Sequence, residues 1–188
     1  MKEILFASGN RHKADEAKKI FSRSGIRIKW AKISLLEPDF ESLREISEHK
    51  ALDAFRKLDK PAIVEDTGIY FSAYKNFPGQ YAKRMFLSLG FEGLLKLLEG
   101  KERKAHFATT ACYYDGKKLL CSTGKLYGKI LESPEGEDKD VLPYEKIFQP
   151  NGKSRPLSLI PRKEKNAFSH RCLAFSGLAA KINSMNQR

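Results

Sequence analysis

The sequence predicts an α/β domain with a mixed β-sheet flanked by helices, and three observations support this fold class. Apolar strands alternate with amphipathic helices through the first third of the 188 residues. The pattern then changes to paired strands joined by Asp115-Gly116, the strongest short hairpin signal. A chain of this length can bury about 70% of its unfolded surface, so we expect residues 1–188 to form a single domain.

The first third of the chain is predicted to alternate strand, helix, strand, helix, strand. The expected ranges are 2–7, 10–24, 26–33, 43–58 and 61–64. In the second helix the apolar residues recur at the i, i+3, i+4, i+7 spacing of a buried face. They are Ala51, Ala54, Phe55 and Leu58. This β-α-β-α-β order is typical of an α/β sheet.

The rest of the chain is predicted to contain a hairpin and two further helices. A turn at 77–79 precedes a short helix that includes residues 91–98. Strands follow at 105–114, 117–123 and 124–131, and then an acidic loop at 132–140. A loop region covers 148–161, and Ser169 begins the last helix.

Composition restricts the partners and the compartment. With 35 basic and 23 acidic residues the net charge is +12, which favours nucleic acid, an anionic membrane or phosphorylated small molecules. No apolar run approaches the roughly 18 residues of a membrane span, and the N-terminus lacks the features of a signal peptide. The spacing and odd number of the three cysteines predict buried free thiols in a reducing cytoplasm. These are Cys112, Cys121 and Cys172.

The segment Ser8-Gly9-Asn10-Arg11-His12-Lys13 is a candidate phosphate-binding loop. It joins a strand to a helix, and a helix N-terminus offers unpaired N–H groups and a positive dipole to an anion. Lys13 adds a charge one turn into the helix. The segment is not a Walker P-loop, and its residues alone favour an ordinary capped helix with a solvated lysine over a phosphate site.

Two further segments carry candidate functional groups. Glu65-Asp66-Thr67-Gly68 follows a buried strand, where paired carboxylates can bind Mg²⁺ and activate water, although a simple turn is the alternative. Lys165-Asn166 precedes Ser169-His170-Arg171, which offers donors to phosphate or to carbonyl oxygens of a base. The alternative there is an exposed basic stretch. No G-x-S-x-G nucleophile elbow occurs, so covalent catalysis is not expected.

Five motifs in register give the chain a family resemblance. The motifs are Ser8/Asn10/Lys13, Lys50/Ala51/Ala54, Asp66-Thr67-Gly68, Pro78-Gly79/Tyr81 and Lys165-Asn166/Ser169-His170-Arg171. The chain resembles the inosine triphosphate pyrophosphatase family from Ile4 to about Leu178, and its archaeal branch most. The family removes deaminated purine nucleotides such as ITP, dITP and XTP.

The resemblance implies a role for each motif. It implies phosphate binding by Ser8, Gly9, Asn10, Lys13, Lys50, Thr67 and Gly68. It implies that Lys13 and Asp66 are catalytic, and that Glu37 and Asp66 hold Mg²⁺. It implies that the base is read by Tyr144, Lys165, Ser169, His170 and Arg171, whose donors suit a 6-keto group.

One segment departs from the family pattern of aromatic-Gly-aromatic-Asp-Pro. Here it is Leu142-Pro143-Tyr144-Glu145-Lys146, so a leucine replaces the ring that stacks on the base. Base–aromatic stacking contributes about 1–3 kcal/mol per base, so base preference is open. We keep two alternatives: a nucleotide- or RNA-binding protein without catalysis, and a pyrophosphatase for another modified nucleotide.

The resemblance also implies an elongated, two-lobed domain with the active site in the cleft between the lobes. It implies a cytoplasmic homodimer acting on a nucleoside triphosphate, with no membrane association and no stable nucleic-acid complex.

Overall fold

The chain forms a mixed α/β structure around one seven-stranded sheet. The computed structural model describes residues 3–36 and 39–185. The strand order is β2-β1-β3-β5-β6-β7, and β4 pairs with β3. The chain divides into two compact units: unit 1 is Met1–Thr67, Thr109–Gly124 and Ser169–Arg188, and unit 2 is Gly68–Ala108 and Lys125–Phe168. The predicted fold class is confirmed.

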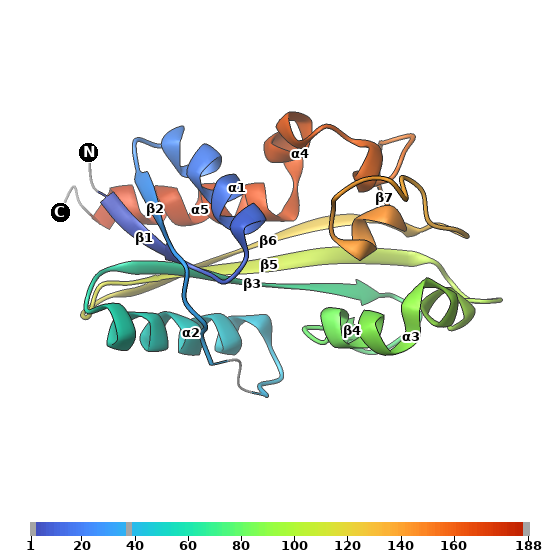
Figure 1. Cartoon of the computed structure of the whole chain (residues 1–188), viewed down its shortest axis with the longest axis horizontal. Coiled ribbons are helices and arrows are strands. Elements are labelled where there is room, and N and C mark those ends of the chain that lie inside the picture. Colours follow the sequence, from blue (N-terminus) through green and yellow to red (C-terminus); the bar gives the residue numbers. More distant parts are fainter. Residues whose placement is uncertain (1–2, 37–38, 186–188) are drawn as a thin grey trace. The chain divides into compact units, whose positions relative to one another are not determined.

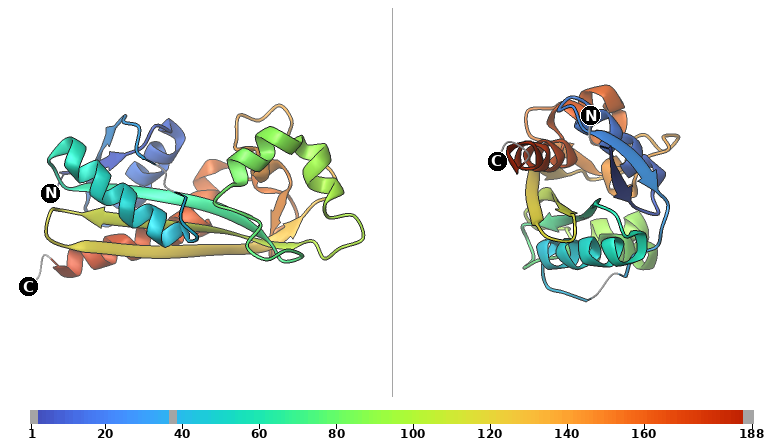
Figure 2. Two further views of the ribbon diagram at one scale, coloured as in Figure 1. Left: turned by 90° about the horizontal axis from the view of Figure 1, so that it is seen from below. Right: turned by 90° about the vertical axis from the view of Figure 1, so that its left-hand side faces the viewer.

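Unit 1 holds the parallel part of the sheet and its covering helices. Strands β1 (Glu3–Ala7) and β2 (Arg27–Ala31) are parallel, and Phe6 of β1 pairs with Trp30. Helices α1 (Arg11–Ser22) and α5 (His170–Met185) cover one face of the sheet (Figure 1). Helix α2 (Leu43–Leu58) lies along the strands on the other face, as the left view of Figure 2 shows. Two buried apolar clusters therefore form, one on each face.

Strand β3 (Ala62–Phe71) is longer than predicted and changes the setting of the acidic motif. The predicted strand ended at Val64, with the acidic motif Glu65 to Gly68 directly after it and a simple turn as the alternative for that motif. The strand continues through these residues, because β5 remains beside it after its pairing with β1 ends at Ile63. The two carboxylates thus project from a rigid strand, beyond the last parallel pair with β1.

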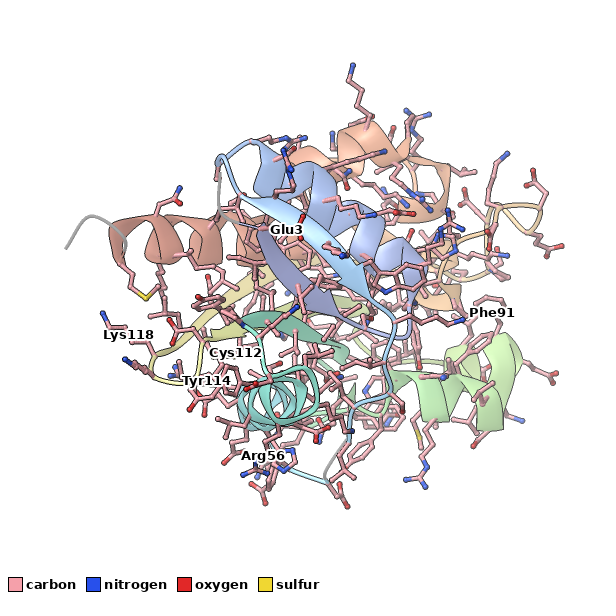
Figure 3. All side chains as sticks on the ribbon, turned by 60° about the vertical axis from the view of Figure 1, so that its left-hand side comes forward. Glu3, Arg56, Phe91, Cys112, Tyr114 and Lys118 are labelled. Atoms are coloured by element: carbon pink, nitrogen blue, oxygen red, sulfur yellow. A yellow bond between two sulfur atoms is a disulfide. The ribbon has the colours of Figure 1, made fainter. Side chains whose placement is uncertain are left out.

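Strands β5 (Lys104–Tyr114) and β6 (Leu119–Ile130) form the predicted hairpin around Asp115-Gly116. The Asp115 carboxylate accepts hydrogen bonds from the amides of Lys117 and Lys118. The predicted separate strands 117–123 and 124–131 are one strand. In Figure 3, Cys112 and Tyr114 lie beside α2, whereas Arg56 extends away from the sheet.

The cysteine prediction is wrong for two of the three residues. A disulfide joins Cys112 to Cys121, with their Cα atoms 4.1 Å apart. The β5–β6 hairpin brings two cysteines that are nine residues apart onto neighbouring strands, and spacing along the chain does not reveal this proximity. Cys172 is a free, buried thiol as expected.

Unit 2 packs helices and short strands around its own core. It contains β4 (Pro78–Gly79), α3 (Ala82–Lys96), η1 (Pro143–Lys146), β7 (Phe148–Pro150), η2 (Leu157–Leu159) and α4 (Arg162–Phe168). Helix α3 is kinked at Gly90, whose φ is 62°. A Cβ atom on Gly68 would lie 2.7 Å from the Gly79 backbone, so the approach of β4 to β3 requires glycine there.

Among residues 3–36 and 39–185, no helix is long and apolar enough to cross a membrane.

Candidate functional site

The loop after β1 forms a capped helix start. The side chain of Asn10 accepts hydrogen bonds from the amides of His12 (2.9 Å) and Lys13 (3.4 Å). The hydroxyl of Ser8 accepts one from the Asn10 amide. Among the predicted phosphate-binding residues, this loop contributes three polar ones, and two of them, Ser8 and Asn10, stabilise the loop and the first turn of α1. The third, Lys13, extends its ammonium group to a carboxylate on β3.

That carboxylate belongs to Glu65, which is the centre of a buried ionic cluster. Its Oε1 contacts Lys13 Nζ, and its Oε2 lies 3.5 Å from Arg171 Nε. Thr67 donates a hydrogen bond to Oε2 at 2.6 Å and lies 2.6 Å from the Thr109 hydroxyl. The Glu65 side chain is only 1% exposed. A buried carboxylate needs such partners, because an unpaired one would be costly.

These partners set the ionisation of Glu65. Burial alone would raise the pKa of its carboxyl group. The charges of Lys13 and Arg171, with the hydrogen bonds from Lys13 and Thr67, outweigh burial and hold the pKa far below its ordinary value. Glu65 is therefore an anion at every physiological pH.

A second pair of opposite charges joins α2 to β3. Lys50 Nζ donates to Asp66 Oδ1 at 3.1 Å, and Lys50 is 6% exposed. Burial raises the pKa of Asp66, while the charges of Lys50 and Lys13 act in the opposite direction. Two adjacent acids on one strand thus have pKa values displaced in opposite directions, a pattern typical of active sites.

The metal prediction can be examined only in part. Glu37 lies outside the described residues. Within the ranges that the structure describes, no group of three or more His, Cys, Asp or Glu side chains is arranged to hold a metal. Asp66 fits Mg²⁺, which is usually held by one or two carboxylates together with water and substrate phosphates. The magnesium site stays a prediction.

The start of α5 carries the third motif of unit 1. The Ser169 hydroxyl accepts a hydrogen bond from the Cys172 amide at 3.1 Å, so Ser169 caps the helix as predicted. His170 and Arg171 are buried rather than exposed. Arg171 Nη1 also lies 3.1 Å from Glu16 Oε2, so carboxylates from α1 and β3 offset its charge at the helix N-terminus.

Unit 2 contains the first residue of the same motif, Lys165, in a buried ion pair. Lys165 Nζ donates to Glu145 Oε2 at 2.5 Å, and both side chains are 9% exposed. Lys165 also borders a cavity of about 350 Å³. The cavity is lined by residues 139–141, 158–162 and Lys165. A donor and an acceptor therefore lie side by side here, and Glu145 belongs to the segment that departs from the family pattern.

Tyr144 is placed differently from the other predicted base-binding residues. Its ring packs in the core of unit 2 near Phe71 and Phe86, and its hydroxyl donates to the Ala82 carbonyl at 2.9 Å. Burial raises the pKa of this hydroxyl. Its predicted contact with a base stays a prediction, and this placement does not favour it.

The sequence reasoning missed residues that complete these clusters. In unit 1 the structure brings Lys13, Lys50, Asp66, Thr67 and Arg171 together. It adds Glu16 and Thr109, which belong to none of the predicted motifs, and it shows that Glu65 of the acidic motif contacts Lys13 and Arg171. The helical spacing of Glu16 from Lys13 offered a weak signal, since residues three apart on α1 share a face. Thr109 offered none, because its contact depends on the pairing of distant strands.

The comparisons with known proteins agree with this architecture. The model of the Ham1 family matches residues 4–181. A dITP/XTP pyrophosphatase of Methanopyrus kandleri is 38% identical over 179 residues, which is 94% of each chain. An inosine triphosphate pyrophosphatase of Yarrowia lipolytica is 35% identical over 178 residues, which is 93% of each. The chain therefore belongs to the Ham1 family, and the predicted resemblance is confirmed.

Solved structures support the fold independently. A HAM1 protein from Coxiella burnetii superposes with a TM-score of 0.82 at 24% identity, covering 98% of this chain and all of the other. The Ham1 protein of Staphylococcus aureus gives a TM-score of 0.74 at 20% identity, covering 97% and 99% of the two chains.

Proposed function

We propose that the protein hydrolyses deaminated purine nucleoside triphosphates to the nucleoside monophosphate and pyrophosphate. The observation that carries this proposal is the arrangement of Lys13 and Lys50. These lysines come from two helices on opposite faces of the sheet, and each reaches one of the adjacent β3 carboxylates. The relatives whose names state an activity are pyrophosphatases for dITP, XTP or inosine triphosphate.

The phosphates would bind at the loop after β1. Lys13 and Lys50 would lie against the triphosphate with the start of α1, whose dipole and amides favour anions. Water would attack the α-phosphorus, and the bond from that phosphorus to the bridging oxygen would break. The two ammonium groups would stabilise the charge that develops on the pyrophosphate.

Asp66 would orient the attacking water and accept its proton. Burial raises the pKa of Asp66, and a cation bound to its carboxylate would oppose that rise. Mg²⁺, held by Asp66 and Glu37, would neutralise phosphate charge when bound.

The protein would recognise the base by the order of hydrogen-bond donors and acceptors on its edge. A 6-keto purine presents a carbonyl acceptor beside an N1–H donor, and adenine presents the reverse order. The Lys165 ammonium and the Glu145 carboxylate offer a donor beside an acceptor, so the pair complements the keto form. His170 and Arg171 would supply further donors. We also propose a homodimer in the cytoplasm, in line with the family resemblance.

Release of pyrophosphate from a substrate panel tests the proposal. We expect ITP, dITP and XTP to be cleaved with Mg²⁺, and ATP, whose 6-amino group reverses this order of donor and acceptor, to be cleaved at least about 100-fold more slowly. GTP and dUTP complete the panel, because guanine shares the keto edge and uracil tests the size of the base. Asp66→Asn should lower turnover by about 100-fold or more. Glu48→Gln, which removes an α2 carboxylate that pairs with Arg44, is the control and should keep turnover.

Three other outcomes would contradict the proposal. Binding of ITP without pyrophosphate release would identify a non-catalytic nucleotide-binding protein. Preference for dUTP would identify a pyrophosphatase for another nucleotide. Full activity of Asp66→Asn would remove Asp66 from the mechanism.

A further inference from the structure

Glu65 is the best-partnered charged group in unit 1 for which the proposed mechanism has no use. Its neighbour Asp66 carries the proposed chemistry, yet Glu65 is the more deeply buried of the two. Keeping a carboxylate anionic at such a depth demands a network of partners. Glu65 contacts three residues, Lys13, Arg171 and Thr67, and Thr109 in turn contacts Thr67.

The positions of these partners suggest what Glu65 does. Lys13 is on α1, Arg171 is on α5, and Glu65 lies on β3 between their charged groups. One carboxylate oxygen contacts the lysine, and the other faces the arginine. Without this anion, the two cations would lose the counter-charge that they share, although Glu16 would still contact Arg171.

We propose that Glu65 is a positioning residue that holds Lys13 and Arg171 in place for the substrate, and is not itself a ligand of the metal. The inference rests on the proposed function, in which Lys13 binds phosphate and Arg171 contacts the base. Both oxygens of Glu65 contact cationic or hydroxyl partners, whereas Lys50 contacts Asp66 at Oδ1, so we assign the metal to Asp66 rather than to Glu65. The Glu65 carboxylate thus contacts both Lys13, at the proposed phosphate end of the substrate site, and Arg171, at its proposed base end.

The contact between Glu65 and Lys13 should weaken binding of the triphosphate and raise the rate of its hydrolysis. Glu65 competes with phosphate for the Lys13 ammonium, so it weakens ground-state binding of the triphosphate. It also keeps Lys13 where the developing charge requires it, and loss of such positioning typically costs about 100-fold in rate. Substitution of a residue with a merely structural role would not strengthen binding of the triphosphate while it lowers turnover.

The experiment compares Glu65→Gln, Glu65→Asp and the control Glu16→Gln with the wild type. Glu65→Gln should bind inorganic pyrophosphate about tenfold more tightly by calorimetry, because a negative charge beside Lys13 has been removed. With ITP its KM should fall or stay constant while kcat falls by about 100-fold. Glu65→Asp should recover part of kcat, and Glu16→Gln should bind pyrophosphate as the wild type does.

A double-variant cycle keeps the test independent of folding losses. In a Lys13→Gln background, adding Glu65→Gln restores charge balance and should change pyrophosphate affinity by less than about twofold. A tenfold change there would overturn the inference, because the effect would not act through Lys13. An unchanged kcat in Glu65→Gln, or weaker pyrophosphate binding, would also overturn it.

Failure of the proposed function gives a different result. A wild type that binds pyrophosphate but cleaves no triphosphate would refute the function, while the pyrophosphate cycle would still decide the role of Glu65. A wild type that binds no pyrophosphate would refute the positioning role.

Discussion

At the scale of single residues, the buried charge of Glu65 makes stability depend on pH. The pKa of Glu65 is lowered on folding from an ordinary value of 4.5. A lowered pKa contributes stability that is fully present above 4.5 and is lost as the pH falls through the folded value. Glu65→Gln should therefore destabilise the protein by about 3 kcal/mol at pH 7. The difference from the wild type should shrink steadily below pH 4.5.

Urea unfolding at several pH values between 7 and 3 would measure this difference. Glu164→Gln is the matched control, because it removes a more exposed carboxylate paired with Lys153. Its effect should be small at every pH. A constant difference between the wild type and Glu65→Gln across the whole range would show that the charge of Glu65 does not stabilise the fold.

At the scale of elements, the contact of α5 with β6 determines where His170 and Arg171 lie. A Cβ atom on Gly124 would lie 2.5 Å from the Ala174 amide nitrogen and would also clash with the His170 carbonyl oxygen. Backbone cannot rotate away as a side chain can. Gly124→Ala should therefore displace the start of α5, lower stability by about 2–3 kcal/mol and lower kcat/KM for ITP by about tenfold or more.

Gly177→Ala provides the control for this prediction. Gly177 lies on α5, two turns after its first residue, His170. A Cβ atom added there would contact the Ser122 hydroxyl, which can rotate away. We expect its thermal midpoint to fall less than that of Gly124→Ala, with kcat/KM retained. Equal losses of activity in both variants would mean that the position of the helix start has no special importance.

At the scale of the whole molecule, the sequence predicts local features well and contacts between distant segments poorly. The motifs located Lys13, Asp66 and Arg171, because helix caps and strand ends leave local signals. The extension of β3 was missed, since its continuation depends on pairing with β5, which is some 40 residues away along the chain. The Cys112–Cys121 disulfide and the Glu65–Arg171 ion pair were missed for the same reason.

Three strands make the two units parts of one cooperative structure. Each of β3, β5 and β6 contributes residues to both units, so unfolding one unit would end the pairing of strands that the other requires. We expect one thermal transition, with a calorimetric enthalpy equal to the van't Hoff enthalpy. Trp30 is the single tryptophan and lies in unit 1, where its indole donates to the Ser8 carbonyl at 2.7 Å.

Trp30 fluorescence should therefore follow unit 1 and coincide with far-UV circular dichroism, which follows the whole chain. Hydrogen exchange of the α3 amides would report on unit 2, and their free energy of opening should fall when Gly124→Ala destabilises unit 1. Two separate transitions, or α3 amides unaffected by Gly124→Ala, would mean that the shared strands do not couple the units. The charge network of unit 1 would then be free to open without loss of the Lys165–Glu145 ion pair of unit 2.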